Sequence, residues 1–242
     1  MTRAATVLVP QSLDAGSLEL LENDLEQASS EDARVLVLRG RPPAFCRGMA
    51  FESLPNDPVE LERALQRFAA VLARLHHAAR PTIAVVEGDA FGGGLGLAAA
   101  CDRVIATTEA RVALPEALFG VLPGVITPVL AGRMPIQKLR LMALDGTSRD
   151  ASWALGAGLF DEVVDPRDHG RARARATSAM SRVSSERVHG LRSWCEEARH
   201  LGTADALGRG AALTSGLLQD PRVRAALRRF AEEGVAPWET QP

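Results

Sequence analysis

The chain has 242 residues, 46% of them hydrophobic, and a formal net charge of −2 at pH 7. This composition predicts a globular protein with a substantial core, and it gives no electrostatic support to a nucleic-acid partner. No apolar run reaches the ~18 residues that a membrane-spanning helix needs, and the three widely spaced cysteines favour free thiols in the cytoplasm.

The first elements alternate between strand and helix. Residues 6–9 predict a strand, and the chain is expected to lead into it without a signal peptide. Leucines on one face predict a helix over residues 17–28, with Asp14 or Ser17 as its N-cap. Residues 35–38 form a short apolar run that is typical of a buried strand.

A turn motif and a long helix come next. The motif is Ala44-Phe45-Cys46-Arg47-Gly48-Met49-Ala50, which follows the strand at 35–38. Pro58 then begins a helix that continues to about Ala78. Apolar residues recur at helical spacing along it and are expected to face the core: Leu61, Leu65, Phe68, Leu72 and Leu75.

Three consecutive glycines, Gly92 to Gly94, join an apolar strand at 82–86 to an Ala/Leu-rich helix. Glycines at such a junction let a ligand approach the backbone, where the unpaired N–H groups of the first helical turn suit an oxyanion. Two alternatives are a partial dinucleotide-binding fingerprint, which is weak evidence, and a tight helix–strand crossing.

A third segment follows the expected strand at 103–106. It runs from Leu114 through Pro115-Glu116 to Pro123-Gly124. In this order and spacing, the turn motif, the triple glycine and this segment resemble the crotonase superfamily of enoyl-CoA hydratases and isomerases, mainly over residues 30–165. The resemblance implies an α/β fold, a crotonase-type spiral of ββα units with a C-terminal helical region.

The resemblance also implies roles for single residues. The backbone N–H groups of Met49 and Gly93 would form an oxyanion hole for a thioester oxygen, and Glu116 would be the catalytic acid and base. The substrate-binding residues would be Phe45, Cys46, Phe91, Gly92, Leu95, Gly96 and Phe119. No metal or redox cofactor is implied, because the thioester itself makes the α-proton acidic enough once its oxygen is stabilised. The substrate would be a thioester of CoA or of the phosphopantetheine of an acyl carrier protein.

One departure from the family bears on the reaction. Hydratases of the family carry a second glutamate where this chain has Gly96. Glu116 would then serve both proton transfers of a hydratase or dehydratase, or the reaction would need only one proton shuttle. The motifs look most like the polyketide-biosynthesis branch, which dehydrates 3-hydroxy-3-methylglutaryl groups on a carrier protein. The alternatives are a Δ3,Δ2-enoyl thioester isomerase and a non-catalytic scaffold.

Helices are expected over residues 137–145 and 151–159, a strand over 160–164, and helix from Asp168 onward. We divide the chain into a spiral core, 1–183, and a helical oligomerisation or lid region, 184–242. The latter should contain two or three amphipathic helices, broken at Gly202, Gly208 and Pro221. Its many apolar positions, together with the family resemblance, predict a homotrimer or hexamer. Examples of these positions are Leu213, Leu217, Leu218, Val223 and Leu227.

The carrier of the acyl group is expected to be a protein-bound phosphopantetheine in preference to free CoA. The family opens with a hairpin that helps bind CoA, and that hairpin looks truncated here. Carrier proteins are typically acidic, so Arg39, Arg41 and Arg47, which flank the turn that opens the site, are the candidate contacts. The alternative is that they are ordinary solvated arginines.

Overall fold

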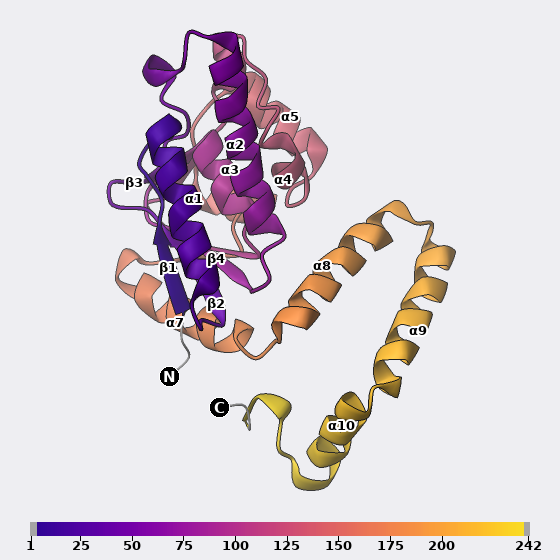
Figure 1. Cartoon of the computed structure of the whole chain (residues 1–242). Helices are drawn as coiled ribbons and strands as arrows, with labels where there is room; N and C mark the ends of the chain where they lie inside the picture. Colours follow the sequence, from indigo (N-terminus) through magenta and orange to yellow (C-terminus); the bar gives the residue numbers. More distant parts are fainter. Residues whose placement is uncertain (1–3, 240–242) are drawn as a thin grey trace. The chain divides into compact units, whose positions relative to one another are not determined.

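The computed structural model describes residues 4–239, and in it the chain forms two compact units. The first unit ends at Ser181 and the second begins at Arg182. Figure 1 shows the strands confined to the first unit, whereas the second consists of helices.

A five-stranded, all-parallel sheet forms the centre of the first unit, with strand order β1-β2-β4-β6-β9. Its central strand β4 is buried at every residue, as a strand covered on both faces should be. The strands are β1 Ala4–Leu8, β2 Val35–Arg39, β4 Thr82–Val86, β6 Arg103–Thr107 and β9 Glu162–Val164.

A second sheet of short strands has the order β3-β5-β7-β8. The first three strands are parallel to one another, and β8 is antiparallel to β7. Each of β2, β4 and β6 passes through a short turn into a strand of this second sheet. These strands are β3 Ala44–Cys46, β5 Asp89–Phe91, β7 Arg111–Ala113 and β8 Arg149–Asp150. The repeated ββα unit confirms the predicted spiral.

Gly88 makes the turn between β4 and β5 possible. A Cβ atom there would lie 2.1 Å from the carbonyl oxygen of Pro43, a backbone atom that cannot move aside cheaply. Only glycine therefore fits this position, where the chain leaves one sheet for the other.

Helices cover both faces of the five-stranded sheet. One face packs on α7, burying alternate residues such as Val35, Val37 and Ile83. The opposite face belongs to the main core, which also takes in Leu18, Leu21 and Leu25 of α1 as predicted. The helices of this unit are α1 Ala15–Ser30, α2 Pro58–His76, α3 Gly93–Ala99, α4 Thr127–Ala131, α5 Ile136–Asp145, α6 Ala151–Ala157 and α7 His169–Met180.

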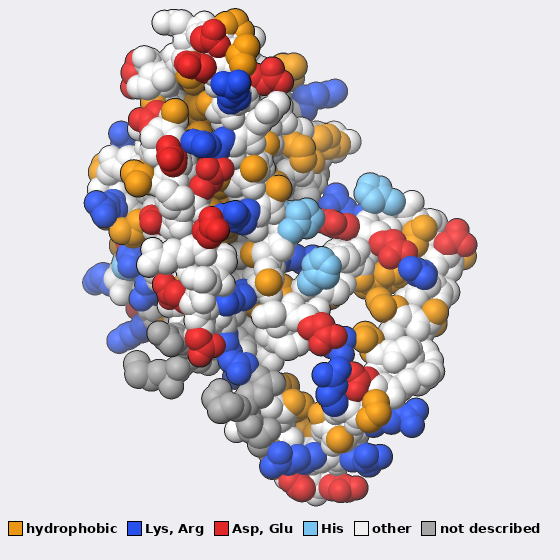
Figure 2. All heavy atoms as spheres, in the orientation of Figure 1, with side chains coloured by type: hydrophobic (Ala, Val, Ile, Leu, Met, Phe, Trp, Pro, Cys, Tyr) orange, Lys and Arg blue, Asp and Glu red, His pale blue; other side chains and the backbone are white. Residues whose placement is uncertain are grey.

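Asp14 is the N-cap of α1. Its carboxylate accepts a hydrogen bond from Ser17 N at 2.7 Å, while Ser17 Oγ accepts one from Asp14 N at 2.8 Å. The two candidate caps are thus the two partners of one capping box. Figure 2 shows acidic and basic side chains interspersed over α1 and α2, and Arg67 pairs with Glu22 at 3.1 Å between these helices.

The second unit contains α8 Ser185–His200, α9 Thr203–Gln219 and α10 Pro221–Glu233. Gly202 and Pro221 lie at the helix boundaries, as predicted. The predicted break at Gly208 is wrong, because this residue lies inside α9. One glycine costs a helix only about 1 kcal/mol relative to alanine, which a 17-residue helix tolerates. Within residues 4–239, no helix is both long and apolar enough to cross a bilayer.

Candidate active site

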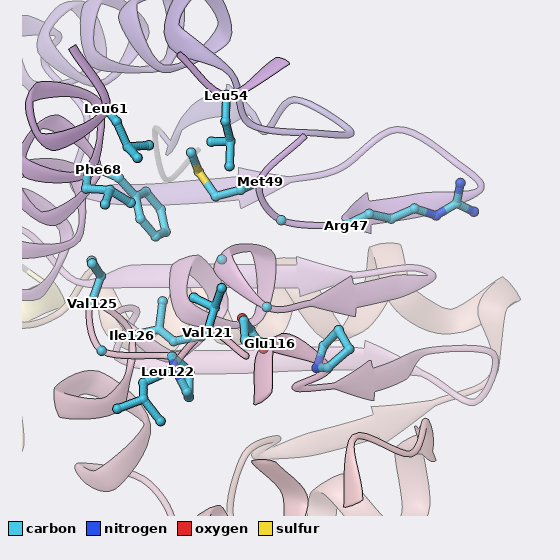
Figure 3. Close-up of a pocket in the computed structure, with 17 residues that line it drawn as sticks. Arg47, Met49, Leu54, Leu61, Phe68, Glu116, Val121, Leu122, Val125 and Ile126 are labelled. Atoms are coloured by element: carbon cyan, nitrogen blue, oxygen red, sulfur yellow. The ribbon is translucent and has the colours of Figure 1, made fainter. Parts of the chain in front are cut away.

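A cavity of about 240 Å³ opens beside the carboxyl ends of β3, β5 and β7. These three strands are parallel neighbours, so the segments that follow them meet at one edge of the second sheet. The segments are the three motifs of the sequence: Arg47-Gly48-Met49, Gly92-Gly93 and Pro115-Glu116, and all of them line the cavity. Leu54, helix α2 and residues 121–126 complete its described wall (Figure 3).

The N–H group of Met49 faces away from the neighbouring strand segment. Met49 forms a parallel bridge with Leu13, in which Leu13 donates to Gly48 O at 2.8 Å and Ala50 donates to Leu13 O at 2.9 Å. In a parallel bridge the N–H of the central residue lies on the opposite side. Among the described residues, no backbone hydrogen bond uses this N–H, so it is a free donor at the cavity.

Gly93 is the first residue of α3, whose opening N–H groups have no partner within the helix. Gly92, the N-cap, has φ +48°, a backbone conformation that favours glycine. The turn at Gly48 lies against this junction, because a Cβ atom on Gly48 would be 3.0 Å from Gly93 N. The donors of Met49 and Gly93 therefore come from two closely packed turns at the same cavity.

Glu116 is the one carboxyl side chain among the described residues that line the cavity. A short helical turn after Pro115, η2 Glu116–Phe119, carries it. Its Oε2 atom is buried without a hydrogen-bond partner in the described part of the chain. Desolvation by burial raises the pKa of this carboxyl above its ordinary value, against a smaller lowering by a backbone hydrogen bond. A carboxyl in such surroundings is a stronger base than an exposed one.

The remaining cavity wall is apolar. Leu61, Leu65 and Phe68 of α2 line it, and a loop lines it as well. Figure 3 shows Leu61 and Phe68 on one side of the cavity and Val125 and Ile126 of that loop on the other. The apolar residues of that loop are Val121, Leu122, Pro123, Val125 and Ile126. Residues 61, 65 and 68 were predicted to face the core, and of these only Phe68 is fully buried. Their spacing signalled an inward face but could not distinguish a core from a cavity wall.

Gly96 lies on α3 beneath this wall, directly against Ile126. A Cβ atom on Gly96 would meet Ile126 Cγ2 at 2.3 Å and Ile126 Cβ at 2.9 Å. Ile126 is 3% exposed, so its side chain fills the space that a residue larger than glycine at 96 would need. Sequence reasoning missed Ile126, and the only signal for it was an apolar pair after Pro123-Gly124.

The structure does not bring all the predicted substrate-binding residues to the cavity. Gly92 lines it. Phe45, Cys46 and Leu95 lie in the core, and Phe119 is 69% exposed on the surface. Neither Phe91 nor Gly96 belongs to the described lining. Burial raises the pKa of the Cys46 thiol to about 12, which fits a packing residue better than a nucleophile.

The family model described as enoyl-CoA hydratase/isomerase matches residues 10–241. The chain therefore belongs to the enoyl-CoA hydratase/isomerase family, the class of protein that the spiral fold and the three motifs indicated.

The chain is also similar to individual proteins of this family and to solved structures. The chain is 27% identical over 225 residues to Bacillaene synthase dehydratase PksH of Bacillus subtilis, which covers 90% of this chain and 84% of that protein. It is 35% identical over 134 residues to Enoyl-CoA isomerase/hydratase fer4 of Mycosarcoma maydis, a match that spans 54% of this chain and only 49% of the relative. A solved structure of Pseudomonas aeruginosa DspI superposes with a TM-score of 0.84 at 26% identity, covering 96% and 92% of the two chains.

Met49→Ala tests whether the side chain or the backbone of this residue matters. The substitution keeps the N–H donor and removes only part of the cavity wall. We expect the preference among acyl chain lengths to change, while kcat on the best small substrate stays within a few-fold of wild type. Steady-state kinetics on a series of acyl thioesters measures both. A large loss with every acyl chain, in a folded variant, would assign the side chain a catalytic role.

Proposed function

We propose that the protein dehydrates a 3-hydroxyacyl thioester, and catalyses the reverse hydration, through an enolate intermediate. One observation carries the proposal: the half-buried Glu116 carboxyl, with its Oε2 atom buried, shares a cavity with the backbone N–H groups of Met49 and Gly93. The donors suit the charge that develops on a thioester oxygen, and the carboxyl suits the α-proton. The similarity to a protein named as a dehydratase, over 90% of this chain, supports this direction of reaction.

One carboxyl group suffices for this dehydration. The Glu116 carboxylate takes the α-proton, and the electron pair of that C–H bond moves onto the thioester oxygen. The N–H groups of Met49 and Gly93 stabilise the enolate, and each such donor contributes about 2.7–4 kcal/mol in the transition state. The carbonyl then re-forms, a double bond appears between the α and β carbons, and the β-carbon releases its hydroxyl group. Protonated Glu116 gives its proton to this group, which leaves as water.

The apolar surroundings of Glu116 favour Δ3,Δ2-enoyl isomerisation as a second candidate. In that reaction Glu116 removes the α-proton and returns it to the γ-carbon, so neither water nor a second carboxyl is needed. Ile126 and its apolar neighbours line the same cavity as Glu116 and place no second carboxyl group beside it. Both candidates share the enolate. Dehydration then expels the hydroxyl group from the β-carbon, whereas isomerisation adds a proton to the γ-carbon.

A panel of thioesters in D₂O separates the functions. The substrates are 3-hydroxyacyl, 2-enoyl and 3-enoyl thioesters. We expect the 3-hydroxyacyl substrate to lose water and the 2-enoyl substrate to gain it. We also expect the recovered 3-hydroxyacyl thioester to carry deuterium at its α-carbon. Conversion of the 3-enoyl substrate alone would support the isomerase. If mass spectrometry finds neither turnover nor deuterium with any substrate, the protein is a non-catalytic scaffold.

We further propose that a carrier protein, in preference to free CoA, presents the acyl group. Arg41 is exposed, and Arg47 is 53% exposed at the cavity, although it pairs with Asp89 at 3.2 Å. Arg39 is less available to a partner, because its guanidinium pairs with Glu87 at 2.6 Å and its side chain is less exposed than that of Arg47. Arg41 and Arg47 are therefore the stronger candidates for contact with an acidic carrier.

Charge reversal at these arginines tests the carrier. Surface ion pairs contribute about 0.2–1 kcal/mol each, so Arg41→Glu should lower kcat/KM for the carrier-bound substrate a few-fold, and Arg41→Glu with Arg47→Glu clearly more. The same acyl group on CoA is the control and should respond less. A preference of the wild-type protein for the CoA substrate would contradict the proposed carrier protein. It would not affect the catalytic role proposed for Glu116.

We also propose that the protein is a homo-oligomer, and the family resemblance favours a trimer or hexamer. The helices α9 and α10 expose apolar side chains that one copy of the second unit leaves uncovered: Leu207, Leu213, Leu217, Leu218, Leu227 and Phe230. Exposed apolar surface of this extent is typical of an interface. Light scattering at micromolar concentration should give a multiple of 25.8 kDa, and a sharp monomer peak would refute the proposal.

A further inference from the structure

We propose that Ile126 restricts this site to reactions that need a single carboxyl group, because its side chain occupies the space that a second carboxyl group at position 96 would need. The inference rests on the proposed function for its chemistry, but its steric part can be tested without any activity. Ile126 has no part in the predicted acid–base or oxyanion machinery, and its identity is not implied by the three motifs.

The contact between Gly96 and Ile126 leaves no room for adjustment on either side. Gly96 lies in the first turns of α3, where its N–H donates to Gly92 O at 3.1 Å. Ile126 is the N-cap of α4, and its carbonyl accepts a hydrogen bond from Leu130 N at 3.1 Å. A β-branched side chain has few rotamers, so Ile126 cannot swing away easily. Beyond Ile126, the nearest atom to a Cβ at 96 is Leu72 Cδ2, at an ordinary 3.8 Å.

The chemical consequence concerns water. Hydration with two carboxyl groups would use one at position 96 to take a proton from water as the hydroxyl oxygen bonds to the β-carbon. The electrons of the double bond would move onto the thioester oxygen, and protonated Glu116 would then give its proton to the α-carbon. Because position 96 is glycine and Ile126 fills the space beside it, Glu116 is the one carboxyl group among the described residues that line the cavity, and an activated water has no second carboxyl partner there.

Thermal stability tests the steric part. Gly96→Ala should lower the melting temperature by at least about 5 °C, because overpacking at a buried contact is destabilising. In an Ile126→Gly background, which removes both atoms that lie within 3.0 Å, the same substitution should cause no further loss. Ile126→Gly alone also creates a cavity, so each comparison is made within one background.

Gly94→Ala is the matched control on the same helix. A Cβ atom there would lie 2.0 Å from the carbonyl oxygen of Cys46, a contact that does not involve Ile126. Its cost should therefore be the same in both backgrounds. If Gly96→Ala is harmless in the wild-type background, or is equally damaging in both, the steric role of Ile126 is disproved.

Activity tests the chemical part. We expect Gly96→Glu combined with Ile126→Gly to hydrate a 2-enoyl thioester at least about tenfold faster than the Ile126→Gly variant, because a correctly placed second base contributes at least that much. Gly96→Glu alone should show no gain. A folded double variant without faster hydration, or an equal gain from Gly96→Glu alone, would overturn the specificity role. If no variant acts on any thioester while the stability coupling is present, the proposed function fails and the steric inference stands.

Discussion

Glu116→Gln should lower the turnover of any thioester substrate by at least about a hundredfold. Glutamine preserves the shape of the side chain but cannot exchange a proton, and general acid–base catalysis contributes about 10²–10⁴-fold. Steady-state kcat and deuterium exchange at the α-carbon should fall together, since both need the same proton transfer. Activity within a few-fold of wild type would remove Glu116 from the mechanism.

The pH dependence of the wild-type protein should reflect the buried carboxyl. Proton abstraction needs the ionised form of Glu116, so kcat/KM should rise with pH through a pKa above that of an ordinary glutamate and then level off. A rise centred at or below the ordinary glutamate pKa would contradict the desolvation of this group.

The same carboxyl should affect stability with the opposite trend. Because burial raises its pKa in the folded state, the folded protein holds the Glu116 proton more tightly than the unfolded chain does. The stabilisation that comes from the protonated Glu116 carboxyl is therefore complete at pH values below its pKa in the unfolded chain. It is lost as the pH rises through its pKa in the folded protein. Relative to wild type, the melting temperature of Glu116→Gln should increase over that pH range, and a difference independent of pH would contradict the assignment.

Gly92→Ala should impair both catalysis and folding. The φ of +48° at this residue costs an alanine about 1–3 kcal/mol in backbone strain. In addition, the new Cβ atom would lie 2.6 Å from Glu116 Oε1, so the carboxyl must move from its place in the cavity. We expect kcat to fall by about a hundredfold, close to the loss for Glu116→Gln, because the same proton transfer is disrupted.

A second glycine with a positive φ and no neighbour at its Cβ position serves as a partial control for backbone strain. Gly234 also has a positive φ, +69°, and a Cβ atom there would meet nothing within 4 Å. Gly234→Ala should therefore lower stability slightly and leave kcat near wild type. If Gly92→Ala retains wild-type kcat, the position of Glu116 beside Gly92 has no catalytic importance.

Periodicity predicted the long elements of the fold well. The strand at 82–86 and the helix that begins at Pro58 lie where the apolar pattern placed them. The second sheet was beyond this reasoning, because β3, β5 and β7 have three residues each and show no readable alternation. The predicted helix break at Gly208 was wrong because one glycine is a weak signal, and the helix-forming residues on both sides outweigh it.

In the candidate site, too, some residues could be predicted from the sequence and others could not. Motif resemblance led to Met49, Gly93 and Glu116, and the parallel order of β3, β5 and β7 places their segments at one cavity. The wall opposite depends on which face of α2 meets which loop, and no local pattern contains that information. Ile126 is the clearest example, since it matters through a residue 30 positions earlier in the chain, Gly96.

The free donors of Met49 and Gly93 belong to the main chain, whereas the carboxyl belongs to a side chain. A point substitution by any residue except proline leaves a main-chain N–H in place, but a single codon change can delete or add an acid. Under the proposed function, activation of the thioester would therefore depend on the fold itself, and the kind of bond that is made or broken would depend on a few side chains around it. Exchanging acids and the residues that crowd them would then change the reaction without rebuilding the part that makes the substrate reactive.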